Sequence, residues 1–305
     1  MPAARLTRER AGVKFAYDDG YAGPPVCFHL PRDVGVVRYS GGALPPFFSG
    51  LLPEGRRLSA IRRATKTSVD DELTLLLAVG GDAIGDVQVC PLDAAEQPTG
   101  MAPPGVPLAE ADFAELFASA VAPEPADRMA LAGAQDKITG RMIALPVSHA
   151  GAACILELDP PEFPHLVANE AFFLGAARAS GLEVADAQVV HDRYGKPGLL
   201  VRRFDRIAGE RGLRALAQED ACQVLGRYPA DRYRVTTEAL IQGLAVHAGA
   251  PVVAARTLLR QFAFAYLSGN GDAHAKNFSI LENGEWRVAP AYDLPCTWVA
   301  TTRWR

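Results

Sequence analysis

The chain has few cysteines and no long apolar run. Its five cysteines are scattered singly and form no C-x-x-C pair: Cys27, Cys90, Cys154, Cys222 and Cys296. An odd, unclustered set of this kind is typical of buried free thiols in a reducing compartment. No stretch resembles a signal peptide or a membrane-spanning helix. We therefore expect a soluble, cytoplasmic protein that makes no membrane contact.

An excess of charge of either sign is also missing. The 31 Lys and Arg residues are balanced by 35 Asp and Glu residues, which gives a formal net charge of −4. The overall composition therefore predicts neither a nucleic-acid-binding protein nor a polybasic membrane anchor. The Gly-rich stretch at residues 80–86 matches neither the G-x-G-x-x-G nor the Walker phosphate-binding pattern, and we interpret it as a structural turn.

What the sequence does contain is enough apolar chain for two packed lobes, because 305 residues with 49% hydrophobic residues exceed the needs of one small core. Alternation and turn residues predict strands at 13–17, 26–30, 87–90, 141–145 and 154–158, and a strand at 198–206 that leaves into a charged turn. Helical spacing predicts helices at 56–63, 73–77 and 108–120, from 165, and at 218–223, 236–247 and 252–267. The arginines of the helix at 56–63 indicate a solvated face or a contact with phosphate or a partner.

The most informative stretch is the polar, Gly-rich turn at residues 269–278. It follows a helix and precedes a hairpin that turns at Asn283-Gly284. Protein kinases use the pattern D-x-x-x-x-N, in which the Asp orients the acceptor hydroxyl and the Asn binds a metal, and a second Asp one hairpin later holds Mg²⁺. Asp272, Asn277 and Asp293 fit these three roles.

Two other interpretations of this stretch remain open. Asp and Asn also cap ordinary turns, so each residue taken singly is explained without any chemistry. Gly271-Asp272-Ala273-His274 also resembles the G-D-x-H-G opening of binuclear metallophosphoesterases, but Ala275 replaces the second Gly and the later blocks of that motif are missing.

Upstream segments offer candidates for nucleotide contacts. The small-residue turn Ala132-Gly133-Ala134-Gln135-Asp136-Lys137 allows backbone amides to approach an anion, and Lys137 adds positive charge. The strand at 198–206 suits an adenine-binding hinge. Glu170 is correctly placed for the helix acid that pairs with a kinase's ATP-binding Lys, but the matching strand position carries Glu157.

The residues that carry a family resemblance occur in order over nearly the whole chain. They are Gly50-Leu51-Leu52-Pro53-Glu54, the turn at 132–137, Arg203-Phe204-Asp205-Arg206, Gln218-Glu219-Asp220, the block D-A-H-A-K-N-F at 272–278, and Pro290-Ala291-Tyr292-Asp293. Together they resemble the HipA family, which are bacterial Ser/Thr protein kinases that act as toxins of toxin–antitoxin modules. The 272–278 block is highly specific.

The resemblance implies an α/β (α+β), two-lobed protein-kinase-like fold related to the phosphoinositide 3/4-kinases, with a mixed α/β N-lobe and a helical C-lobe. It divides the chain into a HipA N-terminal subdomain (1–120), a kinase N-lobe core with phosphate loop and hinge (121–206), and a helical C-lobe (207–305).

The resemblance also implies roles for individual residues. It assigns Asp272 and His274 to catalysis, and Asn277 and Asp293 to metal binding. It implies an ATP-binding set made of the phosphate loop, the strand and helix acids, the hinge and one loop lysine: Ala132, Gly133, Ala134, Gln135, Lys137, Glu157, Glu170, Arg202, Phe204 and Lys276.

The implied cofactors are ATP and Mg²⁺. The implied partners are a HipB-like helix-turn-helix antitoxin, with DNA contacted only through it, and a protein substrate of the translation machinery such as an aminoacyl-tRNA synthetase.

Three departures from the family pattern carry expectations. Glu157 replaces the ATP-binding Lys, so we expect weaker nucleotide binding, and Glu157 or Glu170 should either point away from the cleft or have a raised pKa. Ala130 replaces the regulatory serine, which excludes self-inactivation at that position. The chain begins late and ends twelve residues after Asp293, so we expect a short or split member or a gene fragment. A non-catalytic kinase-fold partner of the antitoxin is therefore the alternative function.

Overall fold

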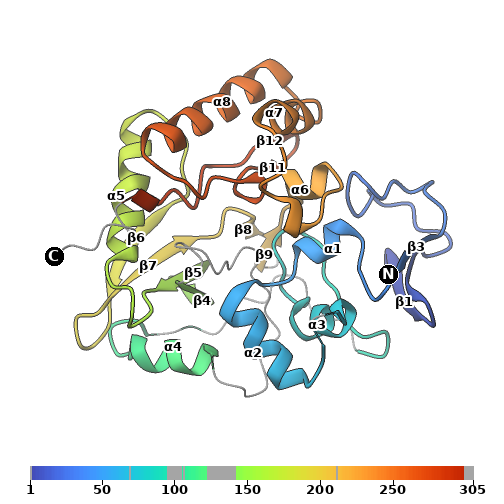
Figure 1. Ribbon diagram of the computed structural model, residues 1–305, viewed down its shortest axis with the longest axis horizontal. Helices are drawn as coiled ribbons and strands as arrows, with labels where there is room; N and C mark the ends of the chain where they lie inside the picture. The colour runs from blue at the N-terminus through green and yellow to red at the C-terminus, as the bar shows by residue number, and fades with distance from the viewer. Residues whose placement is uncertain are drawn as a thin grey trace.

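The computed structural model describes residues 2–68, 70–94, 105, 107–121, 142–210 and 212–298. Its first part is a three-stranded antiparallel sheet of β1 (Ala4–Glu9), β2 (Gly12–Tyr17) and β3 (Val37–Ser40), followed by the helices α1 (Pro46–Gly50), α2 (Gly55–Thr65) and α3 (Glu72–Val79). Figure 1 shows the sheet at one edge of the molecule and the three helices between it and the rest of the chain.

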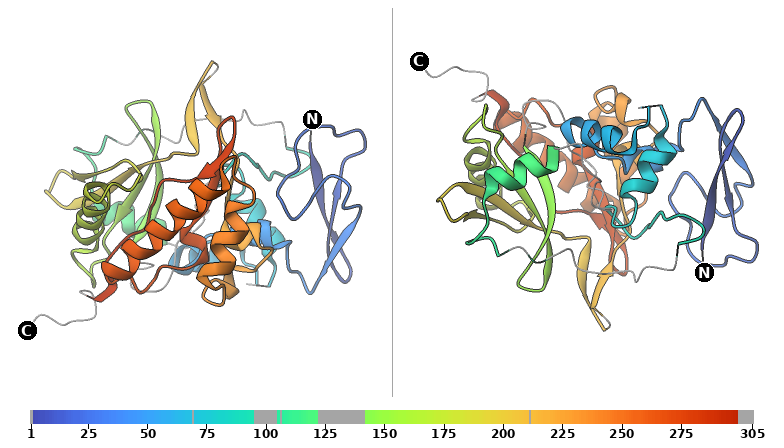
Figure 2. Two further views of the ribbon diagram at one scale, coloured as in Figure 1. Left: turned by 90° about the horizontal axis from the view of Figure 1, so that it is seen from above. Right: turned by 90° about the horizontal axis from the view of Figure 1, so that it is seen from below.

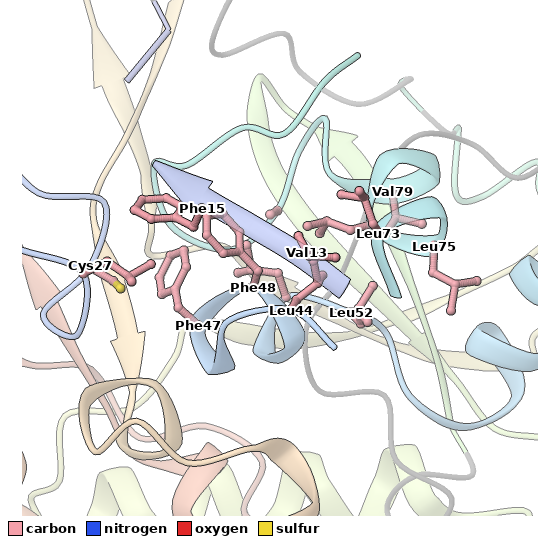
Figure 3. Packing of buried hydrophobic residues seen from close by; sticks show 14 of the residues in the cluster. Val13, Phe15, Cys27, Leu44, Phe47, Phe48, Leu52, Leu73, Leu75 and Val79 are labelled. Atoms are coloured by element: carbon pink, nitrogen blue, oxygen red, sulfur yellow. The ribbon is translucent and has the colours of Figure 1, made fainter. Parts of the chain in front are cut away.

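Alternation along β2 builds the core of this first part. Val13 and Phe15 are buried on one face of the strand, as its period of two requires. Phe15 packs against Phe48 of α1 with ring centroids 6.0 Å apart. Figure 3 shows these residues beside Leu73 and Val79 of α3. Helix α1 is therefore packed against the sheet, and the Phe47 carbonyl on it accepts a hydrogen bond from the Gln223 side chain over 3.1 Å.

The second part is a four-stranded antiparallel sheet in the order β4-β5-β7-β6. Its strands are β4 (Ile143–His149), β5 (Ala152–Leu158), β6 (Ala187–His191) and β7 (Pro197–Arg202). Helix α4 (Phe113–Val121) packs Phe113 and Phe117 against Leu156 and its neighbours. Helix α5 (Leu166–Ala179) packs Val167 and Leu174 in a cluster with Leu199. The two clusters are separate. Strands β5 and β7 each pair on both edges and form the centre of the sheet.

The third part combines two small sheets with helices. The hairpin of β8 (Arg206–Gly209) and β9 (Gly212–Ala215) precedes β10 (Gln218–Asp220), which pairs with β11 (Ser279–Glu282), and β11 pairs with β12 (Trp286–Val288). The helical elements are α6 (Ala221–Val224), η1 (Pro229–Asp231), α7 (Thr237–Ala245), α8 (Pro251–Leu267) and the short 3₁₀ turn η2 (Ala275–Asn277). Figure 2 shows α8 running across this part of the molecule.

Several predicted elements are confirmed, among them the hairpin at Asn283-Gly284 and the helices α2, α3, α5, α7 and α8. The predicted strand at 141–145 is observed as β4, which begins at Ile143. The helix predicted from residue 108 begins only at Phe113, because the Asp112 side chain accepts hydrogen bonds from the backbone N–H groups of Ala114 and Glu115 and so caps the first turn.

Three predictions of secondary structure are wrong. Residues 26–30 form a single bridge, Cys27 to Leu30, because prolines on both sides remove backbone donors. Residues 87–90 form no strand, although the Val89 N–H donates to the Gly80 carbonyl over 2.8 Å. The helix predicted to open at Gln218 is preceded by strand β10, since this segment pairs with β11, and the helix begins at Ala221.

The arginines of α2 serve mainly as ties between segments. Arg56 pairs with Glu162, Arg57 donates to the Ala144 carbonyl, and Arg63 donates to the Val121 carbonyl. These contacts hold α2 against the second part of the chain. Among the described residues, no helix is both long and apolar enough to cross a membrane. The proposed division at residues 120 and 206 stays a prediction.

Candidate active site

The polar turn starts where α8 ends. Gly269 adopts the left-handed conformation (φ 70°), and the Asn270 N–H donates to the Ala265 carbonyl over 2.9 Å. This is the geometry in which glycine ends a helix at little steric cost. The Gly271 N–H then donates to the Thr297 side chain over 2.8 Å. The turn is therefore bound both to the helix before it and to the segment after the hairpin.

Asn270 connects the two acids that the sequence singled out. Its side-chain oxygen accepts a hydrogen bond from the Asp272 N–H (3.0 Å), and its side-chain nitrogen donates to the Asp293 carbonyl (3.3 Å). Asn270 is itself buried. One amide thus holds the backbone of Asp272 next to that of Asp293, 21 positions later in the chain. We gave Asn270 no role from the sequence, although a polar residue between two glycines was a visible signal.

Asn277 and Asp293 are in direct contact. The Asn277 side-chain nitrogen donates to Asp293 Oδ2, while Asn277 Oδ1 is buried with no hydrogen-bond partner among the described residues. Asp293 has a left-handed backbone (φ 54°), which is uncommon for a residue other than glycine. A buried amide oxygen beside a carboxylate is a donor set that a hard cation such as Mg²⁺ prefers. The residues therefore fit the implied metal.

No group of three His, Cys, Asp or Glu residues in the described part of the chain is placed to hold a metal ion. Mg²⁺ does not require such a group, since it commonly binds one or two protein ligands together with water and substrate phosphates. The candidate is therefore a two-ligand site that nucleotide phosphates would complete.

Asp293 lies in an unusually acidic environment. Burial, together with the negative charge of Asp272, raises its pKa to about 7. Burial and, to a smaller extent, the charge of Asp293 raise the pKa of Glu157 to about 8. The pKa of Glu170 is also raised by burial and by the charges of Glu157 and Asp293. A cation bound here would relieve the repulsion among these carboxylates.

Both Glu157 and Glu170 line the same cleft as Asn277 and Asp293. Neither points away. The expectation that one of the two carboxyl groups has a raised pKa is confirmed, and it holds for both. Glu157 Oε2 is buried without a hydrogen-bond partner in the described chain.

Asp272 lies beside the cleft and is covered. It is 5% exposed and is not among the residues that line the cleft wall. Tyr233 donates a hydrogen bond to Asp272 Oδ1, and the Tyr233 ring packs edge-on against His274 with centroids 4.9 Å apart. Burial lowers the pKa of His274 to about 4, even though Asp272 opposes this shift. His274, which lines the cleft, is therefore neutral at pH 7.

Lys276 is tied to the loop after α1. Its ammonium pairs with Glu54 Oε1 over 2.7 Å and donates to the Gly50 carbonyl over 3.4 Å. Arg232 pairs with the other oxygen of Glu54 over 3.0 Å. Lys276 also lines the cleft, but its charge is already shared with Glu54. The motif at 50–54 thus joins the first part of the chain to the polar turn, a role that the sequence did not reveal.

The remaining walls of the cleft are largely apolar. They include Met142 just before β4, Ala144 of β4, Ile155 of β5, Val201 of β7, and Phe204. Phe204 and Tyr292 approach each other with ring centroids 5.7 Å apart. An apolar slot that opens toward charged groups suits a planar base with a polar tail.

Two backbone N–H groups of the predicted hinge at 202–204 make hydrogen bonds within the protein. Arg202 is exposed and lines the cleft, and its N–H donates to the Asp186 carbonyl over 2.7 Å. The Arg203 N–H donates to the Ala153 carbonyl over 2.9 Å. These two backbone donors are therefore already engaged within the protein.

A buried ionic network lies directly behind the hinge. Asp205 accepts from Arg203 (2.7 Å) and Arg206 (2.8 Å), and Asp82 also pairs with both arginines. The Gly85 N–H donates to Asp205 over 3.0 Å. The stretch at 80–86 is thus a structural turn, which Asp82 and Gly85 bind to the hinge and to the residues after it through ion pairs and a hydrogen bond.

The predicted phosphate loop, with Ala132, Gly133, Ala134, Gln135 and Lys137, lies outside the described residues, as does Ala130. The described structure therefore brings together Asp272, His274, Lys276, Asn277 and Asp293 from the polar turn and hairpin. The other cleft-lining candidates are Glu157, Glu170, Arg202 and Phe204.

Comparison with protein families gives two matches along the chain. Residues 129–304 match the model described as the HipA-like C-terminal domain, and residues 1–90 match the HipA N-terminal domain.

Individual relatives cover most of the chain. A protein of Sinorhizobium fredii named "Putative kinase Y4mE" is 33% identical over 96% of this chain and 74% of its own length. The "Serine/threonine-protein kinase toxin HipA" of Shewanella oneidensis is 27% identical over 94% of this chain and 70% of its own length.

Among solved structures, the chain resembles one in the complex of HipA, HipB and operator DNA from Shewanella oneidensis MR-1. The TM-score is 0.75 at 24% identity, and the match covers 97% of this chain and 74% of that one. This likeness concerns the fold. It confirms the mixed α/β, protein-kinase-like fold expected from the sequence.

Proposed function

This chain belongs to the HipA family, and from that premise and the geometry of the cleft we propose that it is an ATP- and Mg²⁺-dependent Ser/Thr protein kinase. The relatives bear the names of kinases and of a kinase toxin. The proposal assigns the acceptor side of the reaction to Asp272 and the metal side to Asn277 and Asp293.

The observation that supports this most strongly is the pair Asn277 and Asp293. A buried amide oxygen without a partner is costly unless a ligand satisfies it. Here the unpaired oxygen is Asn277 Oδ1. The side-chain nitrogen of the same residue donates to the Asp293 carboxylate, whose pKa is raised. A structural role would favour a satisfied amide and a well-paired carboxylate, whereas a metal-phosphate site explains both features together.

The residues of this chain then divide the chemistry between them. Mg²⁺, when bound, neutralises charge on the nucleotide phosphates. Asp272 accepts a hydrogen bond from the acceptor hydroxyl and orients it for in-line attack. His274 stays neutral because of its burial, so it adds no charge to the metal side. The apolar walls receive the base, and the loop at 132–137 remains our candidate for contact with the phosphates.

The partners follow from family membership and belong to the proposal. We propose a helix-turn-helix antitoxin of the HipB kind as the binding partner, because the structural match is a chain from a HipA, HipB and operator DNA complex. In this scheme DNA is contacted only through the antitoxin. The proposed substrate is a component of the translation machinery, such as an aminoacyl-tRNA synthetase.

A second candidate function is a kinase-fold binding protein without catalytic activity. The observation that favours it is the pair Glu157 and Glu170, two carboxylates in one cleft where the family pattern has a Lys and a Glu. Such a protein would bind the antitoxin and would not bind Mg²⁺–ATP measurably.

Two alanine variants test the proposed roles separately. Asp272→Ala should abolish phosphoryl transfer and leave Mg²⁺–ATP binding nearly intact, because Asp272 orients the acceptor. Asp293→Ala should weaken Mg²⁺–ATP binding itself, because the metal carries the charge of the triphosphate. Binding is measured by calorimetry, and transfer by incorporation of ³²P from γ-labelled ATP into dephosphorylated casein.

Asp33→Ala is the matched control, because Asp33 is an exposed acid in the first part of the chain. It should behave as the wild type in both assays. Equal effects of Asp272→Ala and Asp293→Ala on binding and transfer would contradict the assigned roles. A wild-type protein that binds no Mg²⁺–ATP would favour the non-catalytic alternative.

A further inference from the structure

Residues 229–234 form a loop that lies against the catalytic turn. The Ala275 N–H donates to the Arg232 carbonyl over 3.2 Å. The Arg232 side chain pairs with Glu54 over 3.0 Å and donates to the Pro229 carbonyl over 3.1 Å. Arg232 therefore fixes the loop to the polar turn and to the loop after α1 at the same time.

Tyr233, the next residue, covers Asp272. Its hydroxyl donates to Asp272 Oδ1, its ring packs edge-on against His274, and the Arg232 guanidinium lies 5.2 Å from the ring centroid. Tyr233 is 42% exposed, whereas Asp272 is 5% exposed. An exposed side chain is thus in direct contact with the buried candidate catalytic acid.

The hydrogen bond from Tyr233 to Asp272 is of the same type as the bond that a substrate hydroxyl makes to the catalytic Asp of a protein kinase. In a protein kinase, the catalytic Asp accepts a hydrogen bond from the hydroxyl that will be phosphorylated. The Tyr233 hydroxyl makes this same type of bond to the same carboxylate. An oxygen already engaged by a phenol donor is less able to orient a second hydroxyl, so the two hydroxyls compete for Asp272.

We propose that Tyr233 is an acceptor-site gate: its hydroxyl occupies the place of the substrate hydroxyl at Asp272, and a protein substrate must displace it before phosphoryl transfer. This inference rests on the proposed kinase function. The loop backbone is held through Arg232, so rotation of the exposed Tyr233 side chain is sufficient to open the site. A closed gate also shields Asp272 from water, and only an acceptor with enough binding energy opens it.

Two substitutions separate the hydroxyl from the ring. Tyr233→Phe removes the competing donor and keeps the ring against His274, whereas Tyr233→Ala also uncovers Asp272. A hydrogen bond to a charged group is a strong one, so Tyr233→Phe should raise kcat/KM for the acceptor protein about tenfold, mostly through a lower KM. The affinity for Mg²⁺–ATP should not change, because Tyr233 is not among the residues that line the nucleotide cleft.

The first measurement is transfer from γ-labelled ATP to dephosphorylated casein over a range of casein concentrations, with Mg²⁺–ATP affinity measured in parallel by calorimetry. Tyr266→Phe is the matched control, since Tyr266 is 85% exposed on α8, and it should match the wild type. A kcat/KM in Tyr233→Phe equal to or below that of the wild type overturns the gate. A lower kcat would instead make Tyr233 a positioning residue for Asp272.

The second measurement needs no activity and separates the gate from the proposed function. Wild type and Tyr233→Ala are treated with a water-soluble carbodiimide and glycine ethyl ester, and labelling of Asp272 is followed by peptide mass spectrometry. We expect Asp272 to be labelled several-fold faster in Tyr233→Ala, with labelling of Asp33 unchanged. Equal labelling rates overturn the gate, even if the protein binds Mg²⁺–ATP. If the wild type binds no Mg²⁺–ATP, the kinase proposal fails and the labelling still decides whether Tyr233 covers Asp272.

Discussion

Replacing Glu157 by Lys tests whether the carboxylate pair in the cleft limits nucleotide binding. Glu157 lies in β5 beside Glu170, and both line the cleft with Asp293. A lysine at this position would form an ion pair with Glu170 and place an ammonium toward the phosphates. One close charge contact is worth about 1 to 4 kcal/mol between the dielectrics of water and of a protein surface. Glu157→Lys should therefore bind Mg²⁺–ATP at least ~10-fold more tightly, about 1.4 kcal/mol.

Glu157→Gln is the matched control, because it removes the negative charge without adding a positive one. Burial raises the pKa of Glu157 to about 8, so at pH 7 the wild-type side chain is mostly neutral and Glu157→Gln should bind nucleotide with nearly wild-type affinity. At pH 9 the wild type is ionised, and it should bind more weakly than Glu157→Gln. Calorimetric titration with Mg²⁺–ATP at both pH values measures these differences.

Unchanged affinity in Glu157→Lys, with a thermal unfolding midpoint close to that of the wild type, would refute the reasoning. It would mean that the phosphates do not approach residue 157. A loss of affinity at pH 9 that is equal in wild type and Glu157→Gln would refute the role of Glu157 ionisation.

Two further predictions concern stability. Asp205→Ala should lower the free energy of unfolding by about 3 to 5 kcal/mol in urea denaturation, because it removes the more buried of the two carboxylates, Asp205 and Asp82, that Arg203 and Arg206 share. A loss no larger than that of the exposed-site variant Asp33→Ala would contradict this. Burial raises the pKa of Glu219 from its ordinary value of 4.5 to about 8, so its contribution to stability is greatest below about pH 4 and is lost as the pH rises toward 8; Glu219→Gln should reduce this pH dependence, and an unchanged dependence would contradict it.

The polar turn at 269–278 was accessible from the sequence because its signal is local. Spacing alone related Asp272 to Asn277, and the Asn-Gly hairpin brought Asp293 back toward them. Strand alternation likewise predicted the strand at 13–17, which is observed as β2. These features depend on residues close together in the chain, where backbone geometry limits the possible arrangements.

The contacts that complete the site depend on chain segments far apart. Glu54 pairs with Lys276 across more than 200 positions, and Asp82 pairs with Arg203 across more than 100. Nothing in the local pattern around Tyr233 indicates that its hydroxyl reaches Asp272. Likewise, strand β10 appeared helical because its pairing with β11 is set by tertiary structure and overrides local preference.

The most direct test of the account is a crystal structure with Mn²⁺ and a non-hydrolysable ATP analogue, in which anomalous scattering locates the metal. The account predicts a metal peak bound by Asn277 Oδ1 and an Asp293 carboxylate oxygen at about 2.0 to 2.2 Å, bridged to the phosphates, with the base against the apolar walls near Phe204. A metal that contacts neither Asn277 nor Asp293, or a nucleotide bound outside this cleft, would contradict it.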